Sequence, residues 1–250
     1  MAKPAQSAID LKPADRSAIA WAQQTVTRYH YLYRPVDTRC SVEAYVVRLQ
    51  LPWREWKPVG CLVFGRPEAT RCYPWYGSVE DIATGRAMVT RWQVLNLARV
   101  WLDPRVQAGG AWCNPDYLPG FRDRKGIWRS TLASDVLRLA AQRIGFDYLV
   151  RRPPCFLDEP YAILWLLSYL DTRLHKGTIY QQAGFERYRV NRQGIETWRL
   201  PLPPLTANQD AQVRQASILS LRSQRYRAQR FMGEVQMNFW DMQKEQSTNG

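Results

Sequence analysis

Long apolar runs, paired cysteines and internal repeats are all missing from this 250-residue sequence. No stretch approaches the roughly 20 consecutive apolar residues that a membrane-spanning helix needs. The N-terminus carries Lys3, Asp10 and Asp15 but no apolar segment of the kind that a signal peptide contains. We therefore expect a soluble cytoplasmic protein without a membrane partner.

Cysteine pairing is also absent. The five cysteines, Cys40, Cys61, Cys72, Cys113 and Cys155, form no Cys-x-x-Cys pair. Without such pairs and without a secretory context, the sequence predicts reduced thiols and excludes the usual zinc-binding patterns.

Acidic residues are scarce. The chain has 22 Asp and Glu against 35 Lys and Arg, which gives a net charge of +13. This excess favours a polyanionic partner, either nucleic acid or a phosphate-rich cofactor, over a merely soluble basic protein. Hydrophobic residues make up 46% of the chain and can bury a sizeable core, and the 11 tryptophans can fill that core or stack on planar ligands.

The hydrophobic pattern predicts an α/β protein with a mixed sheet flanked by helices. Residues 14–200 form the expected catalytic domain, and residues 205–250 a basic helical C-terminal appendage. Residues 1–13 are expected to be a loose lead. Helices are predicted over 13–33, 130–144 and 210–242, strands over 41–51, 58–67, 94–104, 162–169, 187–190 and 196–200, and loops over 105–129 and 151–160.

The segment "SYLDTRLHKGTIYQQAGF", residues 168–185, gathers several polar groups behind an apolar run. Asp171 follows a predicted buried strand, and His175 and Tyr180 follow within a polar turn and a short helix that Gly184 ends. Polar groups at the carboxyl end of a central strand are where open α/β sheets usually bind ligands.

The spacing Tyr180, Gly184, Phe185 in "YQQAGF" resembles the Tyr-x-x-x-Gly-Phe motif of GNAT acyltransferases. This resemblance implies a GNAT-like, mostly antiparallel central sheet flanked by helices. It also implies that Tyr180 is a general acid toward the thiolate of coenzyme A.

A narrower resemblance is to the phage Mom family, GNAT-like proteins that modify adenine in DNA. It rests on "SYLD" and "HKGTIYQQAGF", on His30-Tyr31, on Arg99 within "LARVWLD" and on the helix led by Ser130, all in the family's order over roughly residues 29–188. The resemblance implies a phage or prophage enzyme that modifies the adenine exocyclic amine with an acyl or aminoacyl donor.

The phosphate-binding loop departs from the GNAT pattern Arg/Gln-x-x-Gly-x-Gly/Ala. Its nearest counterpart, "DRKGIW", has Asp123 and Trp128 at positions that call for a cationic or amide residue and a small one. A backbone cradle needs small residues so that its amides can approach the phosphates. Acetyl coenzyme A stays a possible donor, but its usual mode of binding is not expected.

The candidate site residues fall into four groups. Catalytic candidates are Asp171, Tyr180, Ser130, His30 and Tyr31; donor-binding candidates are Arg99, Ser130 and Gly126; nucleic-acid-binding candidates are Trp128, Trp112, Arg222, Arg225, Arg227 and Arg230; and a metal site of His30, Asp171 and Tyr180 is conceivable.

Each assignment has a plainer alternative. Asp171 is either a base with a pKa raised by partial burial or a helix cap, and Tyr180 is either an acid or a core residue. His30 and Ser130 can be ordinary helix-end residues. Arg99, in an apolar strand, must find a carboxylate such as Asp103 or a phosphate. The tryptophans can be packing residues and the C-terminal arginines a solvated helix face.

Three functions follow in order of preference. The first is modification of adenine in DNA, the second is coenzyme A-dependent acylation of a small-molecule or protein amine, and the third is non-catalytic binding of nucleic acid.

Overall fold

The computed structural model describes residues 9–30, 43–50, 55–67, 76–77, 83–85, 88–107, 110–113, 118–153, 162–221 and 223. The chain divides into two compact units, Met1–Asp147 with Ala162–Pro204, and Tyr148–Tyr161 with Leu205–Gly250. The first unit contains every strand, and the two units are treated separately below.

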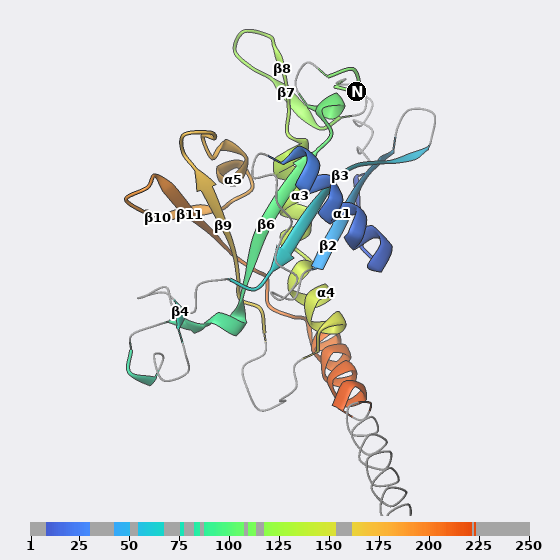
Figure 1. Ribbon diagram of the computed structural model, residues 1–250, viewed down its shortest axis with the longest axis vertical. Coiled ribbons are helices and arrows are strands. Elements are labelled where there is room, and N and C mark those ends of the chain that lie inside the picture. The colour runs from blue at the N-terminus through green and yellow to red at the C-terminus, as the bar shows by residue number, and fades with distance from the viewer. Residues whose placement is uncertain are drawn as a thin grey trace, which may run out of the picture. The chain divides into compact units, whose positions relative to one another are not determined.

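Helices and strands are interspersed along the chain (Figure 1). In order they are β1 (Ile9–Pro13), α1 (Arg16–Tyr29), β2 (Glu43–Gln50), β3 (Trp56–Gly65), β4 (Tyr76–Gly77), β5 (Val89–Thr90), η2 (Arg91–Gln93), β6 (Val94–Leu102), η3 (Pro104–Val106), β7 (Gly120–Arg122), β8 (Trp128–Ser130), α3 (Leu132–Ala141), α4 (Ile144–Arg151), β9 (Trp165–Asp171), α5 (Thr178–Gln182), β10 (Glu186–Val190) and β11 (Ile195–Pro201).

A seven-stranded sheet in the order β1-β2-β3-β6-β9-β11-β10 forms the centre of the first unit. Every neighbouring pair is antiparallel except β6 and β9, which run parallel. The prediction of a mixed, mostly antiparallel sheet flanked by helices is confirmed. Two small two-stranded sheets, β4-β5 and β7-β8, lie outside it.

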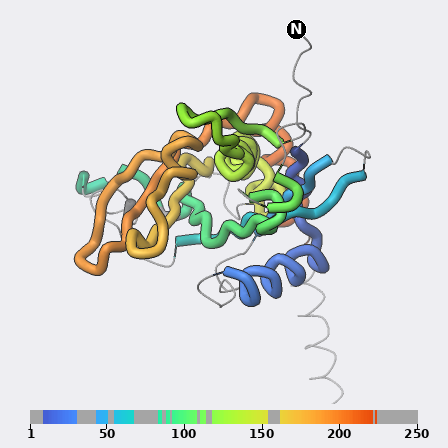
Figure 2. The backbone as a smooth tube through the Cα atoms, turned by 90° about the horizontal axis from the view of Figure 1, so that it is seen from above, coloured from blue at the N-terminus to red at the C-terminus, as the bar shows by residue number. Residues whose placement is uncertain are grey.

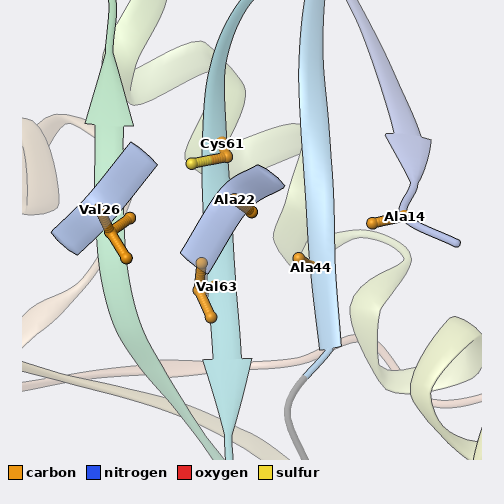
Figure 3. Packing of buried hydrophobic residues seen from close by; sticks show 6 residues of the cluster. All are labelled: Ala14, Ala22, Val26, Ala44, Cys61 and Val63. Carbon is orange, nitrogen blue, oxygen red and sulfur yellow. The ribbon is translucent and has the colours of Figure 1, made fainter. Parts of the chain in front are cut away.

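Helix α1 covers one face of the sheet and α3 lies on the other (Figure 2). Asp15 caps α1, as expected, by accepting a hydrogen bond from the Ala18 amide at 2.9 Å. Small side chains let α1 approach the strands closely. Figure 3 shows this cluster, which consists of Ala14, Ala22, Val26, Ala44, Cys61 and Val63.

Three predictions of local structure are corrected. Residues 9–13 pair with β2 as an edge strand, whereas they were expected to belong to a loose lead. The expected loop 105–129 holds η3, β7 and most of β8. The segment 144–151, to which no element was assigned beyond Ile144, is helix α4. The edge strand depends on a partner far along the chain, and strands of three residues, such as β7 and β8, are too short to show a periodicity.

In the second unit, residues 207–221 are helical. Val213 and Ser217, one turn apart, are its buried residues, and Arg214 pairs with Asp210 on the exposed side. The predicted helix extends to 242, beyond the described residues. Among the described helices, none has the length and apolar character that crossing a membrane requires.

Candidate functional site

Strands β6 and β9 separate partway along their length (Figure 1). Their parallel pairing runs for four residue pairs and ends at Leu97 with Ser168. Beyond that point, 98–102 of β6 pairs with β3 alone, and 169–171 of β9 pairs with β11 alone. The facing edges of 98–102 and 169–171 are called the β6–β9 opening below. Like the edges of a sheet, they present backbone groups that no strand between them uses.

A β-bulge marks the start of this opening. Val63 of β3 is opposite Arg99 and the next residue, Phe64, is opposite Leu97, so Ala98 is the extra residue in β6. A bulge bends its strand and increases the local twist. The bulge at Ala98 therefore turns β6 away from β9 directly after their last pair, Leu97 with Ser168.

Two hydroxyl groups meet where the pairing ends. The Ser168 hydroxyl oxygen lies 3.0 Å from the Tyr180 hydroxyl and 3.3 Å from the Leu97 carbonyl oxygen. A serine hydroxyl has one proton, so it can donate to only one of these oxygens at a time. When Ser168 donates to Leu97, Tyr180 can donate to Ser168, and when Ser168 donates to Tyr180, the phenol proton is available to another group.

The Tyr180 ring is held by aromatic packing and is only 8% exposed. It stacks on Trp198 at 6.0 Å and meets Phe185 edge-on at 5.3 Å between ring centroids. The buried Glu196 accepts a hydrogen bond from the Trp198 indole at 2.8 Å. The predicted motif residues Tyr180 and Phe185 thus pack together, which fixes where the phenol hydroxyl lies.

Asp171 has a different environment from the one expected. Its carboxylate accepts hydrogen bonds from the Arg173 amide at 3.0 Å and from the Arg173 guanidinium at 2.9 and 2.6 Å. Hydrogen bonding to the Arg173 side chain lowers the pKa of Asp171 to about 2. The predicted raised pKa is wrong, because the turn supplies a cation only two residues away. The alternative of a helix cap is also wrong, since α5 is capped at Gly177.

Asp171 and the Tyr180 hydroxyl are on opposite faces of the sheet. Side chains alternate along a strand, and Ser168, which contacts Tyr180, is three residues before Asp171. The carboxylate and the phenol therefore do not face one shared cleft. Asp171 and Tyr180 were also two of the three residues of the conceivable metal site, and they lie too far apart in this arrangement to share a metal ion. Among the described residues, no group of three or more His, Cys, Asp or Glu is arranged to hold a metal ion.

A basic cluster lies on the face that α1 covers. His30 follows α1 as its C-cap, and Arg99 of β6 is opposite Val63, which packs under α1. Burial, with the charges of Arg99 and His175, lowers the pKa of His30 to about 4. His30 and Arg99, predicted separately as a catalytic and a donor-binding residue, are close enough to interact, and His175 lies near them. Tyr31 lies outside the described residues.

Arg99 does not use the carboxylate considered for it. Asp103 instead binds Arg105, with contacts of 2.6 to 3.0 Å to its guanidinium. Arg99 donates to the carbonyl oxygen of its neighbour Ala98 at 2.6 Å. Its proposed contact with a donor phosphate stays a prediction.

The start of α3 differs by one residue from the prediction. The N-cap is Thr131, and Ser130, at the end of β8, accepts a hydrogen bond from the Leu132 amide at 3.2 Å. Ser130, one residue before the N-cap, thus still accepts a hydrogen bond from the first turn of α3. Asp135 places a carboxylate in that turn, which disfavours an anion there.

Gly126 is not beside α3. It has a positive φ of 75° at the exposed tip of the β7–β8 hairpin. Asp123 accepts hydrogen bonds from the Lys125 and Ile127 amides, and the Gly126 amide donates to the Asp123 carbonyl. The amides of Lys125, Gly126 and Ile127 are already used, so they do not support the predicted donor-binding role of Gly126.

The predicted stacking residues sit in separate local structures. Trp112 lies under the Arg105 guanidinium, 3.9 Å from its ring centroid. The Trp128 ring lies so close over Gly120 that a Cβ there would be 2.5 Å from it. Both tryptophans therefore have a face occupied by packing. Arg222, Arg225, Arg227 and Arg230 lie outside the described residues.

Ser168 and Trp198 are the functional candidates that the sequence reasoning missed. Ser168 is the polar residue within the buried run 163–170, and that isolation was an available signal. Trp198 gave no signal of its own, because its role depends on the pairing of β11 with β9.

Comparison with known proteins gives only distant likenesses. No family model matches the sequence, and no curated protein matches it. Among solved structures, the chain is similar to the N-acetyltransferase PseH of Campylobacter jejuni in complex with acetyl coenzyme A (12% identity, 78% of this chain and 99% of that one, TM-score 0.34). It is also similar to AtaTR bound with AcCoA (12%, 84% and 97%, 0.40) and to the GNAT domain of S. lividans PAT (9%, 78% and 89%, 0.34). At these identities and TM-scores the likenesses do not assign an activity to this chain.

Proposed function

We propose that this protein is a GNAT-type transferase that moves an acyl group from a thioester donor to an amine. The observation that carries the proposal is the end of β6–β9 pairing at Leu97 and Ser168, with the Tyr180 hydroxyl 3.0 Å from Ser168. The strand edges beyond this point suit an extended, amide-bearing donor arm, which can pair with free backbone groups as an added strand does.

The reaction assigns one step to Tyr180. The amine nitrogen attacks the acyl carbon, a C–N bond forms and the C–S bond breaks. The leaving thiolate takes the phenol proton, and Ser168 donates a hydrogen bond to the resulting phenolate. The surplus proton of the new amide leaves to water, from which the phenolate is reprotonated. This is the general-acid role that the Tyr-x-x-x-Gly-Phe resemblance implies. Asp171 has no part in it, since a carboxylate with a pKa of about 2 is a poor base.

For the acceptor we propose the exocyclic amine of adenine in DNA. The support is the resemblance to the Mom family and the net charge of +13. An adenine within a duplex must be flipped out before its amine can react. A small-molecule or protein amine is the alternative acceptor, and the basic charge does not favour it.

The first experiment measures the donor and the product separately. Binding of acetyl coenzyme A and longer acyl thioesters is followed by calorimetry, and nucleosides from DNA of expressing cells are analysed by mass spectrometry. We expect an adenine adduct with the wild type, and none with Tyr180→Phe. Tyr188→Phe, a tyrosine of β10 outside the site, is the matched control and keeps activity.

The outcomes separate the candidate functions. Thioester binding with acylation of a free amine, but no adduct in DNA, supports the alternative acceptor. DNA binding that survives Tyr180→Phe, without thioester affinity or any product, contradicts the transferase and leaves a nucleic-acid-binding protein.

A further inference from the structure

The hairpin of residues 120–130, called the β7–β8 ribbon below, takes no part in the proposed chemistry. Its sequence "GFRDRKGIWRS" holds four cations and one acid. It extends away from the seven-stranded sheet (Figure 1). Phe121 pairs with Arg129 and Arg122 with Trp128, so the ribbon is a regular antiparallel pair.

The ribbon is held by its own hydrogen bonds. The Asp123 amide donates to the Ile127 carbonyl at 2.9 Å, and the Asp123 carboxylate accepts from the Lys125 and Ile127 amides, also at 2.9 Å. The Trp128 ring packs over Gly120 at its base. A partner that binds such a preorganised element loses little free energy to ordering it.

Asp123, the acidic residue of the ribbon, binds only groups of the ribbon itself among the described residues. Asp123 binds the turn amides and pairs with Arg129 at 3.0 Å. Arg124 and Lys125 at the tip are exposed and make no ion pair within the described part of the chain. The tip therefore carries uncompensated positive charge.

One side face of the ribbon carries two exposed apolar side chains beside the Arg129–Asp123 ion pair. Phe121 and Ile127 point to the same face, because Phe121 is opposite Arg129 and Ile127 is opposite Asp123. Their exposed fractions are 47% and 48%. Two large apolar side chains next to a cationic tip form a surface that a polyanion with apolar edges would cover.

We propose that the β7–β8 ribbon is the surface by which this protein holds double-stranded DNA, with Arg124 and Lys125 on phosphates and Phe121 and Ile127 against sugars or base edges. A two-stranded ribbon fits the major groove of B-form DNA. An anionic membrane fits less well, because insertion would bury the charged tip before either apolar residue. The proposal rests on the DNA acceptor of the proposed function but not on the transfer step.

The test measures binding of the full-length chain to a fluorescent 20-base-pair duplex by anisotropy between about 50 and 300 mM salt. For Arg124→Ala with Lys125→Ala we expect affinity to fall about tenfold or more, and the slope of log affinity against log salt to shrink by about two. For Phe121→Ala we expect a fall of about tenfold with the slope unchanged, because a stacking or apolar contact releases no counterions.

The matched control removes the same charge elsewhere. Arg189 and Arg192, exposed in the β10–β11 hairpin, are changed to alanine together. We expect this variant to bind DNA nearly as the wild type does. Equal weakening in both double variants would show a general charge effect and overturn the proposal, as would the absence of wild-type binding at low salt.

Two further readouts keep the outcomes distinct. If the tip variant loses binding to phosphatidylserine vesicles while its DNA affinity is unchanged, the ribbon is a membrane surface and the proposal is wrong. Thioester affinity of the tip variant should equal that of the wild type. If the Arg124→Ala, Lys125→Ala variant forms the adenine adduct as the wild type does, the ribbon is not the DNA-binding surface, but the proposed function still holds.

Discussion

The hydroxyl oxygens of Ser168 and Tyr180 lie 3.0 Å apart at the last residue pair that joins β6 to β9. The Tyr180 phenol, which can donate a proton, thus lies at the point where β6 and β9 separate. It is buried, since Ser168 is 1% and Tyr180 8% exposed. In the proposed reaction, the donor therefore reaches the phenol along the strand edges and not through open solvent.

Removing either hydroxyl should separate binding from turnover. We expect Tyr180→Phe to lower the rate of acyl transfer by about 10²-fold or more, because general-acid catalysis typically contributes that much. Ser168→Ala should lower it less, since the phenol remains. Acyl-thioester affinity, measured by calorimetry, should stay within about threefold in both variants. Equal loss of affinity and rate would instead assign both residues a purely structural role.

A methyl group at Gly177 should destabilise the site. Gly177 has a φ of 71°, and a Cβ there would be 2.6 Å from the Trp198 ring. We expect Gly177→Ala to cost about 1–2 kcal/mol for the left-handed conformation and about 1–3 kcal/mol more for displacing the indole. Thermal unfolding gives the measurement. Gly126→Ala is the matched control, because its φ is 75° with open space around the Cβ, and it should show the first cost alone.

Loss of the Glu196 carboxylate should loosen Trp198 and, through it, Tyr180. Glu196→Ala leaves the buried indole N–H without its acceptor, which we expect to cost about 1–3 kcal/mol in the free energy of unfolding. Glu196→Gln keeps an acceptor and should cost less. The exposed Glu186, which pairs with Arg199 on the neighbouring strand, is the control, and Glu186→Ala should change stability little. Equal losses at the two positions would contradict the anchoring role.

His30 should make stability depend on pH between about 6.5 and 4. Its pKa is lowered to about 4 by burial and by the charges of Arg99 and His175, so the folded state stays neutral where the unfolded state takes up a proton. The stabilisation is complete above pH 6.5 and is lost as the pH falls toward 4. Urea midpoints should fall over this range for the wild type and less for His30→Gln. Asp171 does not interfere, because its lowered pKa acts below pH 3.8.

A proton NMR titration measures the pKa of His30 directly. The chain has two histidines, so His175→Gln leaves one imidazole to follow. We expect its ring proton to titrate well below pH 6.5, because burial and the charge of Arg99 still lower the pKa of His30. A midpoint near 6.5 would show that His30 is exposed to water.

Local rules predicted much of the fold. Helix α1, the strands β2 and β3, and the helix stop at Gly184 all depend on neighbours a few residues apart, and the structure confirms them. The edge strand β1 was missed because it is only five residues long, ends at Pro13 and pairs with β2, which begins thirty residues later.

The site was predicted less well for two physical reasons. The resemblance drew attention to Tyr180, but strand alternation places Asp171 on the other face, and a turn closes its carboxylate onto Arg173. The glycine of "DRKGIW" indicates a turn, but only the register of β7 with β8 shows that this turn is a hairpin tip whose amides bind Asp123.

The parallel pairing of β6 with β9 also bears on how the chain folds. Each half of the sheet consists of strands joined by antiparallel contacts, whereas Leu97 and Ser168 are 71 residues apart in the chain. The entropy of closing so long a loop is recovered only after both halves exist. The pairing of β6 with β9 is therefore among the last contacts to form, and the β6–β9 opening exists only once both halves of the sheet are in place.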